Sequence, residues 1–457
     1  LSNGSPLLDA SAASYDHNAP LSPLAARAIE LLRGPQALPY SGGAVGGVVD
    51  VIDDAIPTAP LRGVEGIAQL RGDSAFPGGS AAFSLDGGNG ALGLHADGYK
   101  RRASDYVAPD GAQAESIVDG RVRNSAADGY GGGLGGGVIG RWGFVGLSVR
   151  SDANRYGTIV DPNVEIDMRS ERTSLPGELR HVLGADPLGL AYTHTHYRHT
   201  ELDSGQPATR FVNQGDTLQL SLRRRLVGID LQLGLQALRL AFSALGDEAF
   251  LPQTHTRNTA VFGLASGASG RWAWSAGTRL ESARVSSDGE GATGIARFGA
   301  ASAQRFTPMS VAVQAQYALT PQVALTSTLA HNERAPSYDE LYANGPHDAT
   351  GAYERGNPAL RKERSNSVEL GVKVENARAR YSATAFLTRY SNYIGLVRGG
   401  QTVDGDGNPV PLDTPDSLPE FLYVGVQARF SGIEASLLQP LLDQGGQRLD
   451  LAARLDW

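Results

Sequence analysis

Residues 229–237, IDLQLGLQA, alternate apolar and polar side chains. Successive side chains of an extended strand point to opposite faces, so the aliphatic residues share one face while Asp230, Gln232 and Gln236 share the other. A helix would mix the two sets. The same period of two recurs in VAVQAQYAL (residues 311–319) and VELGVKV (residues 368–374). From about residue 62 onward, the chain is predicted to form many short strands.

The composition excludes several classes of protein. No run of about 18 apolar residues occurs, so membrane-spanning helices are not expected, whereas the alternating strands of a transmembrane barrel escape a hydropathy window. The 457 residues include 58 Gly and no Cys, which disfavours long helices and gives no disulfide framework. A formal net charge of -8 argues against nucleic acid as a partner.

The two ends of the chain are both abrupt. The sequence begins at Leu1 without a signal-peptide pattern, and its last residues, LDLAARLDW, stop within an alternating run. We therefore expect an internal fragment or a processed form of a longer protein.

The connections between the predicted strands alternate between short and long. Short turns are predicted near residues 87–90, 140, 226–228, 266–271, 320–322 and 375–378, and long polar stretches at 102–128, 153–171, 200–213, 287–307, 335–364 and 391–423. Strict alternation places every long loop on one side, as in outer-membrane barrels. A soluble sandwich or propeller is the alternative, but neither requires this asymmetry. We count about 17 strands, with the chain ending inside the last one.

A glycine-crowded stretch, RGPQALPYSGGAVGGVVDV (residues 33–51), precedes the strands. It lacks the Gly-Lys-Ser/Thr ending of a P-loop and the G-x-G-x-x-G register of a dinucleotide site. Its glycines are instead expected to allow tight turns and close backbone approach.

Two separate segments carry a resemblance to a known family. AARAIELLRGPQALPYSGGAVGGVVDVIDDAIPT (residues 25–58) is similar to the late plug region of TonB-dependent receptors, apart from Pro39 and Ser41, where the family usually has Leu and Gly. HNERAPSYDELYANGPHDATGAYERGNPALRKERSNSVELGV (residues 331–372) resembles the family segment that crosses from one strand through an extracellular loop to the next.

The resemblance implies a fold, a location and a set of partners. We expect an all-β protein: an antiparallel transmembrane β-barrel of the 22-stranded type, truncated by about five strands. Residues 1–58 would be the carboxyl-terminal part of the plug domain inside the lumen, and residues 59–457 the incomplete barrel. The protein would lie in the bacterial outer membrane, with outer-membrane lipid and the TonB energy-transducing complex as partners. The coupling box that contacts TonB would lie upstream of Leu1.

Within the family, the chain is most similar to zinc-type (ZnuD-like) receptors. DASAASYDHNAPLSPL (residues 9–24) resembles their plug phrase, and YRHTEL (residues 197–202) has a counterpart in them. The resemblance implies a metal site formed by Asp16, His17 and His347, with Glu201 as a further candidate. The region that matches their His-rich loop, residues 155–175, contains no His and no Cys, which leaves the identity of the metal open.

His194 and His196 are candidates for a different reason, because a spacing of two on a strand places both imidazoles on one face. Imidazole and carboxylate groups suit Zn²⁺ and similar ions, but a polar lumenal wall would explain the pair as well.

The expected function is energised uptake of a metal ion, zinc or a similar ion, that is cargo and not a resident cofactor. The alternatives are a receptor for a ferric siderophore, haem or another metal chelate, or a passive porin or adhesin barrel. No nucleophile elbow or H-E-x-x-H helix is present, so no enzyme activity is expected.

Overall fold

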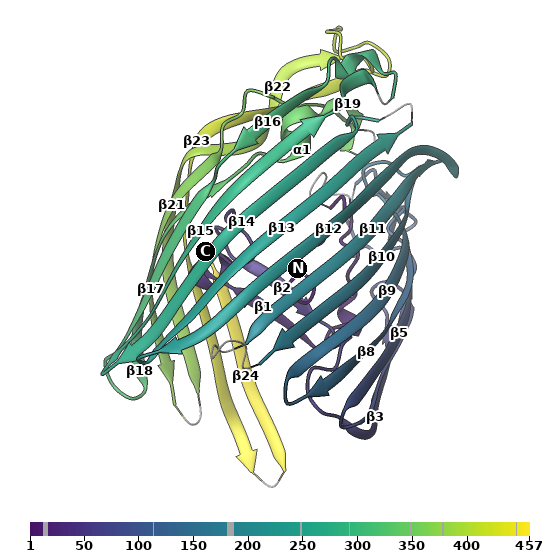
Figure 1. The fold of residues 1–457 in the computed structure, drawn as a ribbon. Helices are drawn as coiled ribbons and strands as arrows, with labels where there is room; N and C mark the ends of the chain where they lie inside the picture. The colour runs from purple at the N-terminus through teal and green to yellow at the C-terminus, as the bar shows by residue number, and fades with distance from the viewer. Residues whose placement is uncertain are drawn as a thin grey trace.

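The structure is a computed structural model that describes residues 1–11, 17–112, 114–180, 187–246, 249–291, 293–347, 350–376, 379–444 and 446–457. Strands dominate it, and no helix in the described part of the chain is long and apolar enough to cross a membrane. One large antiparallel sheet curves into a barrel (Figure 1). Within the described residues, seventeen of its strands have ten residues or more: β3 (Arg62–Asp73), β4 (Gly78–Asn89), β5 (Leu92–Ala103), β8 (Ala127–Gly140), β9 (Gly143–Gly157), β10 (Val164–Leu179), β11 (Leu188–Asp203), β12 (Gln206–Leu226), β13 (Ile229–Leu245), β14 (Thr254–Ser269), β15 (Trp272–Ser287), β17 (Met309–Ala318), β18 (Val323–Arg334), β21 (Glu363–Glu375), β22 (Arg380–Val403), β23 (Leu418–Gln444) and β24 (Gln447–Asp456).

Strands that follow one another along the chain pair with one another, which makes the sheet an up-and-down meander. Short strands add to it at one end: β16 (Ser302–Phe306) pairs with β15, and β19 (Asn344–His347) pairs with β20 (Ala352–Arg355). β20 also runs parallel to β23. The side chains of β24 are exposed along its whole length, and so are nearly all of those of β3.

The two faces of the sheet differ as the alternation predicts. On β13, Leu233 and Leu235 are exposed on the outer face, while Gln236 and Phe242 are buried on the inner face. Leu370 on β21 is likewise exposed. Leu231, Val368 and Val372 have the same outward parity and are half-buried. The aliphatic outer face is the band expected to contact lipid.

Replacing Leu233 with arginine tests this band. A charged side chain near the bilayer midplane of a transmembrane barrel costs roughly 2–4 kcal/mol of folding free energy. We expect Leu233→Arg to lower the free energy of unfolding in lipid vesicles by that amount, measured by urea titration. A variant as stable as the original protein would show that Leu233 does not face lipid.

Two of the predicted long loops are mainly strand instead. β9 and β10 are joined by residues 158–163, and β11 and β12 only by Ser204 and Gly205. The polar residues of 153–171 and 200–213 continue the strands beyond the aliphatic band, where water can contact the outer face. Similarly, much of residues 391–423 belongs to β22 and β23. The predictions of loops there were wrong because polarity on both faces was read as the absence of a strand.

The extracellular-type connection at residues 335–362 has structure of its own. A capping box at Ser337 and Glu340 begins the short helix α1 (Tyr338–Tyr342), and the β19–β20 hairpin follows it. A buried cluster that includes Tyr338, Leu341 and Phe250 packs this connection against the barrel wall. The cluster fixes the hairpin over the interior of the barrel.

The described part of the N-terminal segment (residues 1–58) lies against the inner face of the sheet (Figure 1). Its own hairpin pairs β1 (Ala28–Leu32) with β2 (Val48–Ile52). Asn213 Nδ2 donates to Asp9 O at 2.7 Å, and Ser5 Oγ lies 3.1 Å from Thr193 Oγ1. The segment is therefore bonded to the barrel wall at several heights.

Glycine is required where this segment turns and touches the wall. Gly47 has a φ of +121°, and a Cβ there would lie 2.8 Å from Leu32 O. A Cβ at Gly43 would lie 2.9 Å from Arg334 Cβ on β18. The glycine-rich stretch thus serves close packing, as the sequence suggests.

Candidate metal centre

Three side chains of the kinds that can ligate a metal converge inside the barrel. His17, Glu201 and His347 each offer a ligand atom, and these atoms all lie within 4.8 Å of one another. The three residues are 5 %, 5 % and 1 % exposed. They come from the N-terminal segment, strand β11 and the β19–β20 hairpin, three parts of the chain that are far apart in sequence. Only the folded arrangement brings them together.

The alternation of β11 places Glu201 in the interior. Thr193, Thr195, Tyr197, His199 and Glu201 are all buried, whereas the residues between them are not. Antiparallel pairing aligns Glu201 with Ile166 of β10, whose side chain is fully buried. The carboxylate is therefore held on the inner wall near the end of the strand.

His17 is oriented by the backbone of its own segment. Its Nδ1 lies 3.0 Å from Ala10 O, and its Nε2 lies 3.5 Å from Glu201 Oε1. A hydrogen bond from Nδ1–H to a carbonyl leaves the ring lone pair on Nε2, which is the form that binds metals. Next to it, Asn18 N donates to Tyr156 Oη at 2.8 Å.

His347 is oriented by a buried carboxylate. Its Nδ1 lies 3.0 Å from Glu354 Oε1, across the β19–β20 hairpin. The other carboxylate oxygen, Glu354 Oε2, accepts a hydrogen bond from Tyr423 Oη at 3.4 Å. The Phe250 ring stacks on the imidazole, with centroids 4.1 Å apart. A carboxylate on one ring nitrogen and a metal on the other is a recurrent arrangement of protein metal sites.

His199 lies beside these three residues and was not among the residues predicted from the sequence. Its ring centroid is 4.4 Å from that of His17, and its Nδ1 lies 3.1 Å from Tyr197 Oη. Its Nε2 is buried without a hydrogen-bond partner in the described part of the chain. The i, i+2 spacing of His199 and Glu201 within YRHTEL was the signal that could have identified it.

The remaining predicted residues do not join this centre. Asp16 lies outside the described residues. His194 and His196 share one face of β11, but it is the face opposite to Glu201. His194 Nδ1 instead lies 2.9 Å from Asp216 Oδ1 on the outer surface. The i, i+2 reasoning was correct about their common face, but the parity of the strand turns that face away from the interior.

A buried acidic residue lies near the hairpin, in helix α1. Tyr423 Oη lies 3.4 Å from Asp339 Oδ2 as well as from Glu354. Burial, with a further contribution from the Glu340 carboxylate, raises the pKa of Asp339 to about 7. An acid whose folded pKa is raised destabilises the fold increasingly as the pH rises from its unfolded pKa, near 4, to its folded pKa.

Asp339→Asn should therefore stabilise the protein at pH 8, by up to about 4 kcal/mol, and this benefit should shrink toward pH 4. Urea unfolding of the purified protein at pH 4, 6 and 8 measures it. A benefit that is equal at all three pH values would contradict a buried, proton-holding Asp339.

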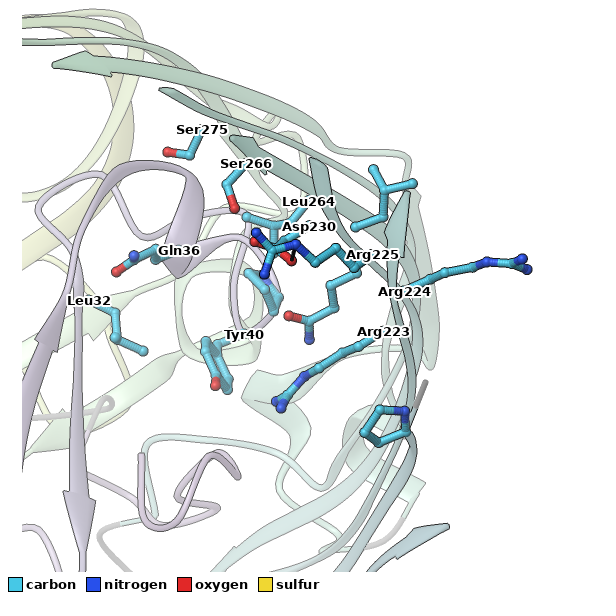
Figure 2. Close-up of a pocket in the computed structure, with 14 residues that line it drawn as sticks. Leu32, Gln36, Tyr40, Arg223, Arg224, Arg225, Asp230, Leu264, Ser266 and Ser275 are labelled. Carbon is cyan, nitrogen blue, oxygen red and sulfur yellow. Dashed lines mark ion pairs between the residues drawn. The ribbon is translucent and has the colours of Figure 1, made fainter. Parts of the chain in front are cut away.

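A cavity of about 620 Å³ lies at the opposite end of β12 and β13 (Figure 2). It is lined by Gln36 and Tyr40 of the N-terminal segment and by Arg223 and Arg225 of β12. Figure 2 shows Arg224 pointing away from it. The one acidic residue among its described lining residues, Asp230, pairs with Arg225, so the charge of Arg223 remains in excess and repels a metal cation. The buried centre around His17 is the better cation site.

The chemistry of the buried centre suits a borderline divalent ion. Two imidazoles and one carboxylate are donors that Zn²⁺ takes at about 2.0–2.2 Å, and imidazole also suits Cu²⁺ and Ni²⁺. Burying imidazole and carboxylate groups is costly unless other polar groups or an ion compensate for the lost hydration. The burial of the donors therefore fits a bound cation.

Comparisons with known proteins agree with this architecture. Residues 98–457 match the family model described as "TonB dependent receptor-like, beta-barrel". Among solved structures, the chain is similar to the copper transporter OprC, with a TM-score of 0.80, 16% identity, and coverage of 100% of this chain and 70% of that one.

Two further structures are similar at low identity. A double mutant of the Serratia marcescens hemophore receptor HasR, in complex with its hemophore HasA and heme, gives a TM-score of 0.70 and 16% identity over 95% of this chain and 69% of that one. The siderophore receptor PirA from Pseudomonas aeruginosa gives a TM-score of 0.67 and 19% identity, with coverage of 94% of this chain and 72% of that one. At these identities the likeness establishes the fold.

Proposed function

Because the chain belongs to the TonB-dependent receptor-like β-barrel family, we propose that it takes up a divalent metal ion, with zinc as the favoured cargo, through the centre formed by His17, Glu201 and His347. Members of this family are transporters of the Gram-negative outer membrane that use the TonB complex, so the chain is an outer-membrane protein with TonB as its partner. The convergence of the three donors from separate parts of the chain carries the metal proposal.

Burial of the donors favours a bare ion over a large chelate. His17, His347 and His199 are each 5 % exposed or less, and Phe211 and Phe250 stack directly on two of the rings. A siderophore or haem needs a pocket of several hundred Å³. An ion needs only the space between donor atoms, which matches the spacing of less than 4.8 Å.

The arrangement also supplies a route to release. We take residues 1–58 to be the carboxyl-terminal part of the plug. His17 belongs to this segment, whereas Glu201 belongs to the barrel wall and His347 to an extracellular hairpin. When TonB pulls the plug, His17 leaves the other donors, and the ion loses one of its ligands. The affinity for the ion is therefore high while the plug is in place and low once TonB has moved it.

Uptake by living cells tests this function. The full-length protein is produced in a Gram-negative strain that lacks its own zinc receptors, and accumulation of labelled Zn²⁺, Cu²⁺ and a ferric siderophore is measured with and without an uncoupler. We expect zinc accumulation that the uncoupler abolishes, that His347→Ala abolishes, and that the control His194→Ala leaves intact. Zinc uptake that resists both the uncoupler and His347→Ala would contradict the proposal, as would accumulation of the ferric siderophore alone.

A further inference from the structure

Four arginines lie directly opposite one another across four neighbouring strands. The register pairs Arg239 of β13 with Arg257 of β14, Arg257 with Arg284 of β15, and Arg284 with Arg305 of β16. All four side chains are exposed. They have the outward parity of Leu233, Val261 and Leu280, so this arginine row lies on the outer surface of the barrel.

Such a row is unfavourable unless something neutralises it. Directly opposed like charges destabilise a sheet, and the strands are only about 4.8 Å apart. Arg239 lies opposite Asp216 of β12 and interacts with its carboxylate electrostatically. In the part of the chain that the structure describes, Arg257, Arg284 and Arg305 lie opposite one another with no acidic residue between them. Because the four arginines stand in one line, we expect an anion that contacts several of them at once.

The height of the row identifies the environment of that anion. On β15, Trp272 and Trp274 lie at the short-turn end, Leu280 follows, and Arg284 comes after it near the long-loop end. Aromatic side chains mark one membrane interface, and about ten residues of a tilted strand cross the apolar band of roughly 25 Å, so Arg284 lies just beyond it. The arginine row therefore lies at the outer-leaflet interface, because long loops are extracellular.

A basic cavity continues the row at Arg305. It has a volume of about 590 Å³ and is lined by Arg305, Arg361, Lys362 and Arg364, together with Thr307 and Asn392. Lys362 and Arg364 both pair with Glu333. Arg305 and Arg361 have no such acidic partner among the described residues, so the cavity keeps an excess of positive charge.

We propose that the arginine row and this cavity bind the phosphorylated glycolipid of the outer leaflet through its phosphate groups. Guanidinium groups bind phosphate oxygens in a bidentate manner. Four arginines at strand spacing extend over roughly 14 Å, which is long enough to contact more than one phosphate on a glycolipid headgroup. The aliphatic band directly below the row would pack against its acyl chains.

Binding of lipid A tests the proposal. The purified protein in detergent is titrated with bisphosphorylated lipid A, with enzymatically dephosphorylated lipid A, and with inorganic phosphate as competitor. We expect the bisphosphorylated form to bind at least tenfold more tightly than the dephosphorylated form, and millimolar inorganic phosphate not to displace it. Replacing all four arginines of the row with glutamine should remove this preference.

Arg210→Gln is the matched control, since Arg210 is exposed on the outer face of β12 but its cross-strand neighbours are Thr200 and Leu245. It should bind lipid A as the original protein does. Equal affinity of the original protein for the two forms of lipid A would overturn the proposal without the need for any variant. Full displacement of lipid A by inorganic phosphate would instead show that the site binds free phosphate. Loss of lipid A binding in Arg210→Gln would show that any positive charge on the outer surface contributes and that the arginine row is not a specific site.

Discussion

His17→Ala should weaken Zn²⁺ binding by the full-length protein by roughly 100-fold or more, because loss of even an outer-shell group costs 10–100-fold in metal affinity. The Nε2 of His17 lies 3.5 Å from Glu201 Oε1, and its ring is 5.7 Å from that of His347. The remaining two donors would leave the ion with too few ligands for tight binding. Competition titration with a zinc indicator measures the affinity.

His194→Ala is the control for that experiment, since it also removes one imidazole, but from the outer face of β11, where His194 pairs with Asp216. It should change zinc affinity little. If His17→Ala and His194→Ala bound zinc equally well, the buried centre would not be the metal site, although the barrel and its family would stand.

Arg279→Met should destabilise the attachment of the N-terminal segment by about 3–5 kcal/mol, because it removes one partner of a buried ion pair. Arg279 is 2 % exposed and pairs with Glu281. Its Nη1 donates to Leu38 O and Pro39 O at 3.2 Å, and its Nη2 donates to Gln236 Oε1 at 2.6 Å. Without the guanidinium, the Glu281 carboxylate keeps only its hydrogen bonds from Gly42 N and Asn258 Nδ2, and its charge has no opposite charge beside it.

Limited proteolysis of residues 1–58 and urea unfolding measure this effect. Faster cleavage of the segment is expected in Arg279→Met, with partial recovery in Arg279→Met/Glu281→Gln, where the unbalanced carboxylate is removed as well. The surface pair Arg155 and Glu165 provides a control, because exposed ion pairs contribute about 0–1 kcal/mol. Equal cleavage of the original protein and Arg279→Met would contradict the role assigned to Arg279.

The strand pattern could be predicted from sequence because each strand has one apolar face. Leu233 and Leu235 are exposed outside the barrel and Gln236 is buried inside it, as the alternation in residues 229–237 requires. The pattern fails beyond the aliphatic band, where both faces of a strand meet water or other polar groups. For this reason β22 and β23 extend far into a region that was expected to be a loop.

The candidate site could be predicted only in part, and the reason lies in β11. The stretch THTHYRHTEL offers polar side chains on both faces, so its composition does not say which face is internal. Packing determines which face of β11 points inward. Tyr197 and His199 are fully buried, and Asn213 on β12 anchors the N-terminal segment against the same wall. The resemblance to a known plug phrase and loop identified His17 and His347, while local periodicity favoured His194 and His196.

Anomalous X-ray scattering from crystals of the zinc-loaded, full-length protein tests the central claim most directly. A single zinc peak is expected between the N-terminal segment, β11 and the β19–β20 hairpin, with His17 and His347 nitrogens and a Glu201 oxygen at about 2.0–2.2 Å. A zinc peak elsewhere, or an occupied site that lacks both His17 and His347, would contradict the account.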